Sequence, residues 1–220
     1  MQDLVAVENP RPEREPMSDK PKSPERLVFF SDAVVAIALT LLVLPLVDVV
    51  SEARKAGAMP PVQDLLADNQ AVIWSFLISF VVIVRLWIVH YRVFEQVKAY
   101  SMALMIVNLT WVLTVVFLPF ATELVANYSS RDRLVLVLYV GTLFISSVLL
   151  AALLWIVRND PEVRRAPDAI SDRWWFDATS SAATFLVILV LVAAFPVLSY
   201  YTLALLVVQP QIVRLRYRAR

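Results

Sequence analysis

The sequence predicts an all-α polytopic membrane protein with six transmembrane helices, and three observations favour that fold class. Of its 220 residues, 60% are hydrophobic and the mean hydropathy is +0.69, whereas soluble domains are about 45–50% apolar. Apolar runs long enough to cross a bilayer recur along the chain. The chain has no Cys, which excludes a disulfide framework, a thiolate metal site and a thiol nucleophile.

The elements follow in order along the chain. Residues 1–25 hold five prolines and many charges, which is typical of a flexible tail, and they lack the apolar core of a signal peptide. A membrane domain covers residues 26–214, and residues 215–220 form a basic tail. The helices of the membrane domain are expected near residues 28–48, 71–93, 102–125, 134–157, 176–196 and 198–214. A short amphipathic turn is expected around residues 62–66.

The distribution of Lys and Arg predicts the orientation in the membrane. With the amino terminus in the cytosol, 15 of these residues lie in the inside loops and tails, four lie in the outside loops, and Arg85 lies within the second span. Inside loops are enriched in Lys and Arg. The sequence therefore predicts a multi-pass protein of the cell (inner) membrane with both terminal tails in the cytosol.

The first predicted helix, in "RLVFFSDAVVAIALTLLVLPL" (residues 26–46), carries a mostly aliphatic stripe. At about 100° per residue, one side of the helix collects Phe30, Ala33, Ile37, Thr40, Leu41, Leu44 and Asp48, with Asp48 at the external mouth. Asp32 falls about 140° from Ile37, so it is expected to anchor the helix to its own bundle. Periodicity alone favours ordinary helix packing for the stripe.

Several polar residues are expected at one depth near the cytosolic ends of the first three helices. A hydrogen-bonded network that holds the first helix against the next two is predicted for Arg26, Ser31, Asp32, His90 and Asn108. A proton-sensing network is the alternative, because His titrates near neutral pH. The chain has one His and no Cys, so no metal site is predicted.

Three stretches carry recognisable motifs in order along the chain. In the first, the matching positions are Arg26, Phe30, Ser31, Asp32, Ala36, Ile37, Thr40 and Leu44. The second is "SFVVIVRLWIVHYRVF" (residues 79–94), which holds Trp87, His90 and Phe94, and the third is "FLPFATELV" (residues 117–125). Together they resemble the transmembrane protein 175 family of potassium channels in its prokaryotic single-repeat form. Residues 126–220 match only in having three more predicted spans.

The resemblance implies a homotetramer with a central potassium pore lined by the first helices. In the family, apolar side chains of this helix form the narrow section, so Ile37 is expected as the inner constriction, with Leu41 and Leu44 as further rings and Thr40 as the polar candidate beside them. Such rings can gate a pore by dewetting. The chain has only Gly57 and Gly141, and no glycine-rich carbonyl filter. No cofactor and no nucleic-acid partner are expected, with K+ as the permeating ion.

Other functions remain open at this point. A secondary transporter of a cation or small solute is the main alternative, although such folds usually contain broken helices near mid-membrane, and Pro45 and Pro119 lie toward the outer ends of their spans. An intramembrane enzyme would need more than one His to build a site, and a purely structural protein is a further alternative. Arg85 is expected to form a structural ion pair with Asp177 or Asp32; facing the pore, it would disfavour cations.

Overall fold

The computed structural model describes residues 23–57, 59–128, 132–167 and 170–194. Five stretches of this part are long and apolar enough to cross a membrane, and the predicted all-helical polytopic membrane protein is confirmed. The sixth predicted span (198–214), the predicted basic tail (215–220) and residues 1–22 of the first tail lie outside the described residues. The described helices are α1 (Glu25–Leu41), α2 (Leu44–Lys55), α3 (Val62–Asp68), α4 (Gln70–Glu95), α5 (Met102–Asn127), α6 (Arg133–Asn159) and α7 (Asp172–Ala194).

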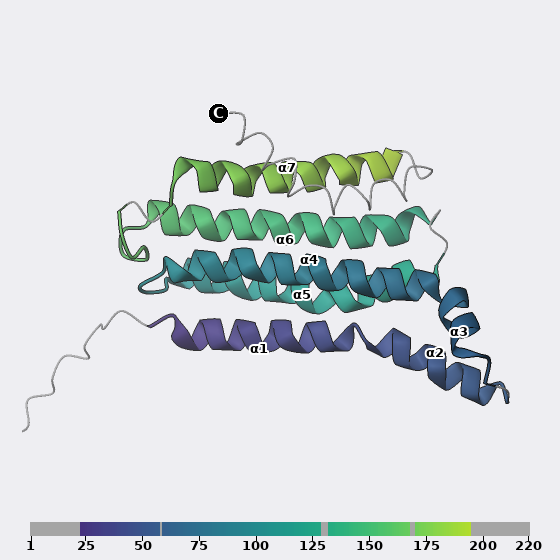
Figure 1. Ribbon diagram of the computed structural model, residues 1–220. Coiled ribbons are helices and arrows are strands. Elements are labelled where there is room, and N and C mark those ends of the chain that lie inside the picture. Colours follow the sequence, from purple (N-terminus) through teal and green to yellow (C-terminus); the bar gives the residue numbers. More distant parts are fainter. Residues whose placement is uncertain (1–22, 58, 129–131, 168–169, 195–220) are drawn as a thin grey trace, which may run out of the picture.

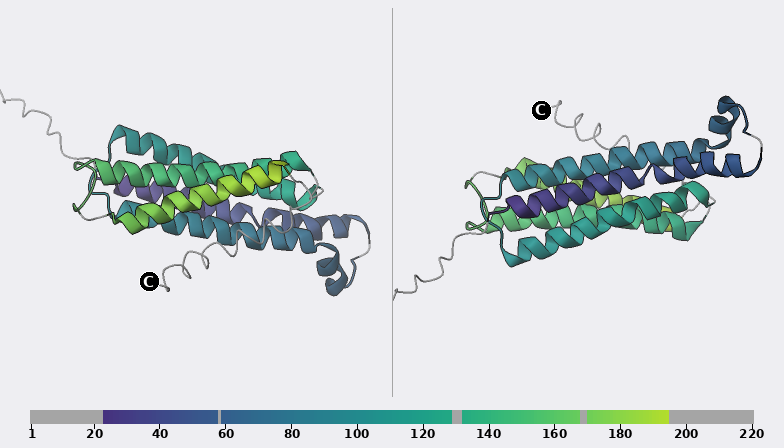
Figure 2. Two further views of the ribbon diagram at one scale, coloured as in Figure 1. Left: turned by 90° about the horizontal axis from the view of Figure 1, so that it is seen from above. Right: turned by 90° about the horizontal axis from the view of Figure 1, so that it is seen from below.

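The long helices run alternately up and down in a layered bundle (Figure 1). α4 and α5 form the middle layer, α1 packs against both of them on one side, and α6 packs on the other side with α7 outside it. α1, α5 and α7 begin at one end of the bundle, where α4 and α6 finish. We call this the basic end; α2 and α3 lie at the opposite end (Figure 2).

The core lies along α5 and α6, because these helices have neighbours on two sides. Trp111, Leu104 and Leu118 of α5 are almost completely buried. α6 has the largest buried share of the spanning helices, with Leu143, Leu153 and Leu154 inaccessible to solvent. Within the described part of the chain, α1 and α7 are peripheral and bury only one face each.

The first span is interrupted, which differs from the single helix predicted over residues 28–48. α1 ends at Leu41 and α2 begins at Leu44, although Leu42 and Val43 keep right-handed helical dihedral angles. Pro45 explains the interruption, since it has no N–H for the carbonyl of Leu41 and its ring clashes with that carbonyl. α1 and α2 still form one apolar stretch, Glu25–Lys55.

The connections at the basic end are held to each other. The backbone N–H of Lys98 donates to the carbonyl of Val163 at 2.9 Å, and that of Arg165 donates to the carbonyl of Gln96 at 2.7 Å. These bonds flank an isolated antiparallel bridge between residues 97 and 164. The α4–α5 loop and the α6–α7 loop therefore form one structural unit.

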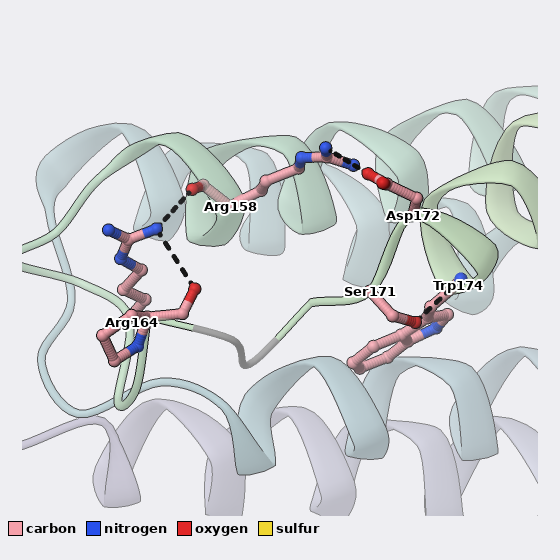
Figure 3. A network of polar contacts seen from close by, with 6 residues as sticks. Arg158, Arg164, Ser171, Asp172 and Trp174 are labelled. Atoms are coloured by element: carbon pink, nitrogen blue, oxygen red, sulfur yellow. Dashed lines mark hydrogen bonds and ion pairs between the residues drawn. The ribbon is translucent and has the colours of Figure 1, made fainter.

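A polar cluster fixes the turn from α6 to α7 (Figure 3). The guanidinium of Arg158 pairs with the carboxylate of Asp172 at 2.6 Å and lies 5.9 Å from the ring centre of Trp175. Arg164 Nη1 donates to the carbonyls of Arg158 and Pro167 at 3.3 and 3.5 Å. Because the Arg158–Asp172 pair is largely exposed, it orients the loop more than it stabilises the fold.

Candidate functional site

The two faces of α1 have opposite environments. Its buried residues are Ser31, Val35 and Ala38, which face α4 and α5, the helices that α1 contacts. About 130° away from this buried face, Ile37 is 58% exposed. The rest of the described chain leaves this second face uncovered.

All of the predicted stripe residues lie on the uncovered side. Phe30, Leu41 and Leu44 are 50%, 41% and 51% exposed, and Thr40 is exposed as well. Asp48 is exposed on α2, beyond the interruption. The stripe is therefore continuous as an exposed surface, although it extends over two helical segments instead of one.

The hydroxyl of Thr40 has a defined orientation. Its Oγ1 donates to the carbonyl oxygen of Ile37 at 2.7 Å, so the hydroxyl proton is used inside the helix. A hydroxyl oxygen retains lone pairs when its proton is donated elsewhere. Thr40 consequently presents an acceptor oxygen among the aliphatic side chains of the stripe.

Behind the stripe, a buried chain of hydrogen bonds joins α1, α5 and α4. Asn108 Nδ2 donates to Ser31 Oγ at 2.8 Å, and Asn108 Oδ1 lies 2.7 Å from His90 Nε2, which acts as the donor. Ser31 also donates to the carbonyl of Leu27 at 2.9 Å. All three members of the chain are 0% exposed. We call Ser31, Asn108 and His90 the inner polar chain.

Aromatic rings enclose the histidine of this chain. The imidazole of His90 stacks on the indole of Trp111 with ring centres 4.1 Å apart and an angle of 9° between the planes. The ring of Phe94 lies 4.5 Å away. These contacts fix the plane of the imidazole, so that Nε2 is directed at Asn108.

Asp32 belongs to a separate contact. Its Oδ1 accepts the indole N–H of Trp87 at 2.8 Å, which ties α1 to α4 at the edge of their interface. Arg26 is exposed and joins neither this pair nor the inner polar chain. The network predicted from the sequence is thus two smaller units, and the sequence reasoning missed Trp87 as the partner of Asp32. The available signal was that an indole N–H inside a membrane span needs an acceptor, which does not say which acceptor it finds.

A second buried polar group was not predicted. Ser79 Oγ on α4 lies 3.0 Å from the hydroxyl of Tyr139 on α6, and Thr122 on α5 donates to Ser79 Oγ at 2.8 Å. We call these residues the outer polar group, since they lie toward the α2 end of the bundle. They are uncharged hydroxyls in apolar helices, so periodicity gave no signal for them.

The structure also describes Arg85 and the side chains that could bind a metal ion. Arg85 is half-buried on α4, about 140° around that helix from His90. Within the described ranges, no group of three or more His, Asp or Glu side chains is arranged to hold a metal ion. The inner polar chain has only one metal-binding side chain, His90, among its members.

These features define a multi-pass helical membrane protein whose first span is fastened by polar bonds on one face and open on the other. Residues 26–119 match the sequence profile of a family described as "Endosomal/lysosomal potassium channel TMEM175". A protein of Chamaesiphon minutus named as a potassium channel is 32% identical over 143 residues, which are 63% of this chain and 68% of that protein. The chain belongs to the TMEM175 family.

Other relatives match shorter parts of the sequence. A protein of Streptomyces collinus named as a potassium channel is 33% identical over 108 residues, 49% of this chain and 50% of that protein. The human endosomal/lysosomal proton channel TMEM175 is 30% identical over 105 residues, 47% of this chain and 20% of that protein. The match therefore spans about half the length of the Streptomyces relative and a fifth of the human one.

The fold itself matches a solved structure. The crystal structure of a lysosomal potassium-selective channel TMEM175 homologue from Chamaesiphon minutus superposes with a TM-score of 0.68. The alignment covers 86% of this chain and 97% of the other, at 24% sequence identity. At this level of identity the likeness establishes the fold.

Proposed function

We propose that this chain assembles as a homotetramer that forms a passive potassium channel, with the exposed stripe of α1 and α2 lining its central pore. The observation that carries the proposal is the open apolar stripe on a helix whose opposite face is fastened to its own subunit. A pore-lining helix needs both properties, because it must expose one face to the permeation path and hold its position. The names of the bacterial relatives support potassium as the ion.

In this proposal each stripe residue has a distinct role. Ile37 forms the narrowest ring, and Leu41 and Leu44 form further rings toward the α2 end. Four copies of a bulky aliphatic side chain exclude water from a narrow pore and so close it to ions. Thr40, with its acceptor oxygen outward, offers a partly dehydrated cation a ligand. Asp48 gives the mouth a negative charge that attracts cations.

The inner polar chain and the Asp32–Trp87 pair serve the pore indirectly in this scheme. Both lie on the side of α1 away from Ile37 and bond it to α4 and α5. In lipid, a polar side chain without a partner is costly, so these bonds resist rotation of α1 about its axis. Resistance to rotation keeps Ile37 directed at the pore.

A secondary transporter is the second candidate, because the interruption of the first span after Leu41 resembles the broken helices of transporters. The two functions differ in energetics. A channel passes ions without a coupled gradient and shows single-channel current steps, whereas a transporter turns over slowly and requires a coupled substrate. The proton-channel name of the human relative makes H+ the other ion to be measured.

The proposed setting is the cell (inner) membrane, with the basic end and both termini in the cytosol. The charges support this orientation, since the basic end collects Arg92, Lys98, Arg158, Arg164, Arg165 and Arg173 and cytosolic loops are enriched in such residues. No cofactor and no nucleic acid take part in the proposed activity.

The test is reconstitution of the purified protein in planar bilayers under opposed K+ and Na+ gradients, repeated with a pH gradient. A reversal potential near that of K+ is expected. Ile37→Asn replaces four butyl groups by amides that retain water, so conductance should rise and potassium preference should fall. Leu39→Asn, on the packed face about 160° away, is the matched control and should change stability instead.

Several results would contradict the proposal. A reversal potential near zero would exclude selectivity, and one that follows the pH gradient would identify H+ as the ion. Current and selectivity unchanged in Ile37→Asn, in protein that elutes normally on gel filtration, would move the pore to another face.

A further inference from the structure

The short helix α3 has a position unlike that of any other described helix. It runs across the direction of the long helices at the α2 end and projects from the side of the bundle (Figures 1 and 2). Only one residue, Asn69, separates it from α4. The side-chain amide of Asn69 donates to the carbonyl of Leu65 at 2.8 Å, so the corner between the two helices is fastened.

α3 is amphipathic along its whole length. With Val62 as reference, Leu66 lies at about +40° and Leu65 at about −60°, whereas Asp64 and Asp68 lie on the other side, near −160° and −120°. Leu65 is partly covered, as expected from the contact between α3 and α4. Val62 and Leu66 remain 69% and 52% exposed, and both acids are exposed.

The depth of α3 follows from the length of α4. Residues 71–91 of α4 carry no charge except Arg85 and reach about 30 Å at 1.5 Å per residue, which is the thickness of the hydrocarbon core. The first turn of this segment therefore lies at the edge of the core, and α3 directly precedes it. Trp74 in that turn is 61% exposed, and Trp is enriched at the interface between lipid and water.

From this geometry we propose that α3 is a membrane-surface anchor, which lies in the headgroup region of the leaflet at the α2 end. The apolar side chains of Val62 and Leu66 enter the lipid, while Asp64 and Asp68 face water. Interfacial helices bind in this way, parallel to the bilayer plane with one face buried. The exposed apolar face of this seven-residue helix consists of these two side chains. The area that two side chains can bury is far smaller than the roughly 800 Å² per partner of a stable protein interface.

The absence of Cys from the chain allows a direct test. Leu66→Cys and Asp64→Cys place a single thiol on opposite faces of α3, and each is labelled with the environment-sensitive fluorophore NBD in proteoliposomes. Quenching is then measured with a lipid that carries a nitroxide near its headgroup, and separately with aqueous iodide. The Leu66 label should emit at shorter wavelength and be quenched by the lipid nitroxide. The Asp64 label should be quenched by iodide.

Three results would overturn the proposal. Equal iodide quenching at both positions would place the whole of α3 in water, and lipid quenching at both would place it inside the hydrocarbon. Shielding of the Leu66 label from both quenchers would mean that protein covers this face, for instance a second copy of the chain. Val62→Cys repeats the test on the same face, and gel filtration confirms that the labelled variants are folded. The readout does not depend on ion conduction.

Discussion

The inner polar chain predicts a large loss of stability when its central residue is removed. Asn108 is 0% exposed and bonds to both α1 and α4, through Ser31 and His90. Asn108→Ala removes both bonds without placing a new polar atom in the core. Ser31 and His90 then differ in the hydrogen bonds that they retain.

The magnitude follows from these partners. Ser31 keeps its bond to the carbonyl of Leu27, so its loss is close to the average for a hydrogen bond inside a membrane protein, about 0.6 kcal/mol. His90 loses the bond at Nε2, and Nδ1 is already buried without a partner in the described structure. A buried polar group left unsatisfied costs about 1–3 kcal/mol. Asn108→Ala should therefore destabilise the fold by about 1.5–3.5 kcal/mol.

The assay is equilibrium unfolding in mixed micelles of dodecyl maltoside and SDS, followed by far-ultraviolet circular dichroism. Thr110→Ala is the matched control, since Thr110 lies on the same helix and is exposed, and its hydroxyl donates only to the carbonyl of Ile106 in that helix, at 2.9 Å. The control should change stability by less than about 0.5 kcal/mol. Equal losses in the two variants would refute the reasoning that the chain holds α1 to its neighbours.

Three further variants test the other polar contacts between helices in the same titration. Trp87→Phe removes the donor to Asp32 and should cost about 1–2 kcal/mol, whereas Asp32→Asn keeps an acceptor for the indole and should cost less; the reverse order would show that the charge of Asp32 matters more than this bond. Tyr139→Phe removes one partner of Ser79 and should cost about 1 kcal/mol, because Thr122 still donates to the serine; no change would mean that the hydroxyls of the outer polar group are dispensable.

Much of the fold could be predicted because long apolar runs report spanning helices directly. The spans predicted at 71–93, 102–125 and 134–157 became Gln70–Glu95, Met102–Asn127 and Arg133–Asn159. The predicted amphipathic turn at residues 62–66 became α3, Val62–Asp68, and that prediction is confirmed. The predicted helices were too short at their ends, because the helices continue past the hydrocarbon core into regions where charged residues are tolerated. α7 shows this, since it begins at Asp172 and not at residue 176.

The polar contacts were less accessible to sequence reasoning. A shared depth near one end of the bundle indicated that Asp32, His90 and Asn108 would lie together, because each is within about two turns of its helix end. His90 and Asn108 do bond to each other, but the partner on α1 is Ser31 and Asp32 bonds to Trp87. Depth does not specify which atoms pair. The Asp32–Trp87 bond depends on the rotation and crossing of α1 and α4, and the outer polar group depends on the mutual packing of three helices. A periodic pattern within one helix specifies neither how two helices cross nor how three helices pack together.

The interruption of the first span divides it into a fastened part and an unfastened part. The side-chain hydrogen bonds that join this span to α4 and α5 lie on α1, at Ser31 and Asp32, whereas α2 has no buried residue. Pro45 creates the division, because without its N–H the helix cannot carry its hydrogen-bond ladder smoothly from α1 into α2. Ile37 lies within the fastened part, one to two turns from Ser31 and Asp32. Leu44 and Asp48 lie in the unfastened part, where α2 contacts α4 without a buried residue of its own.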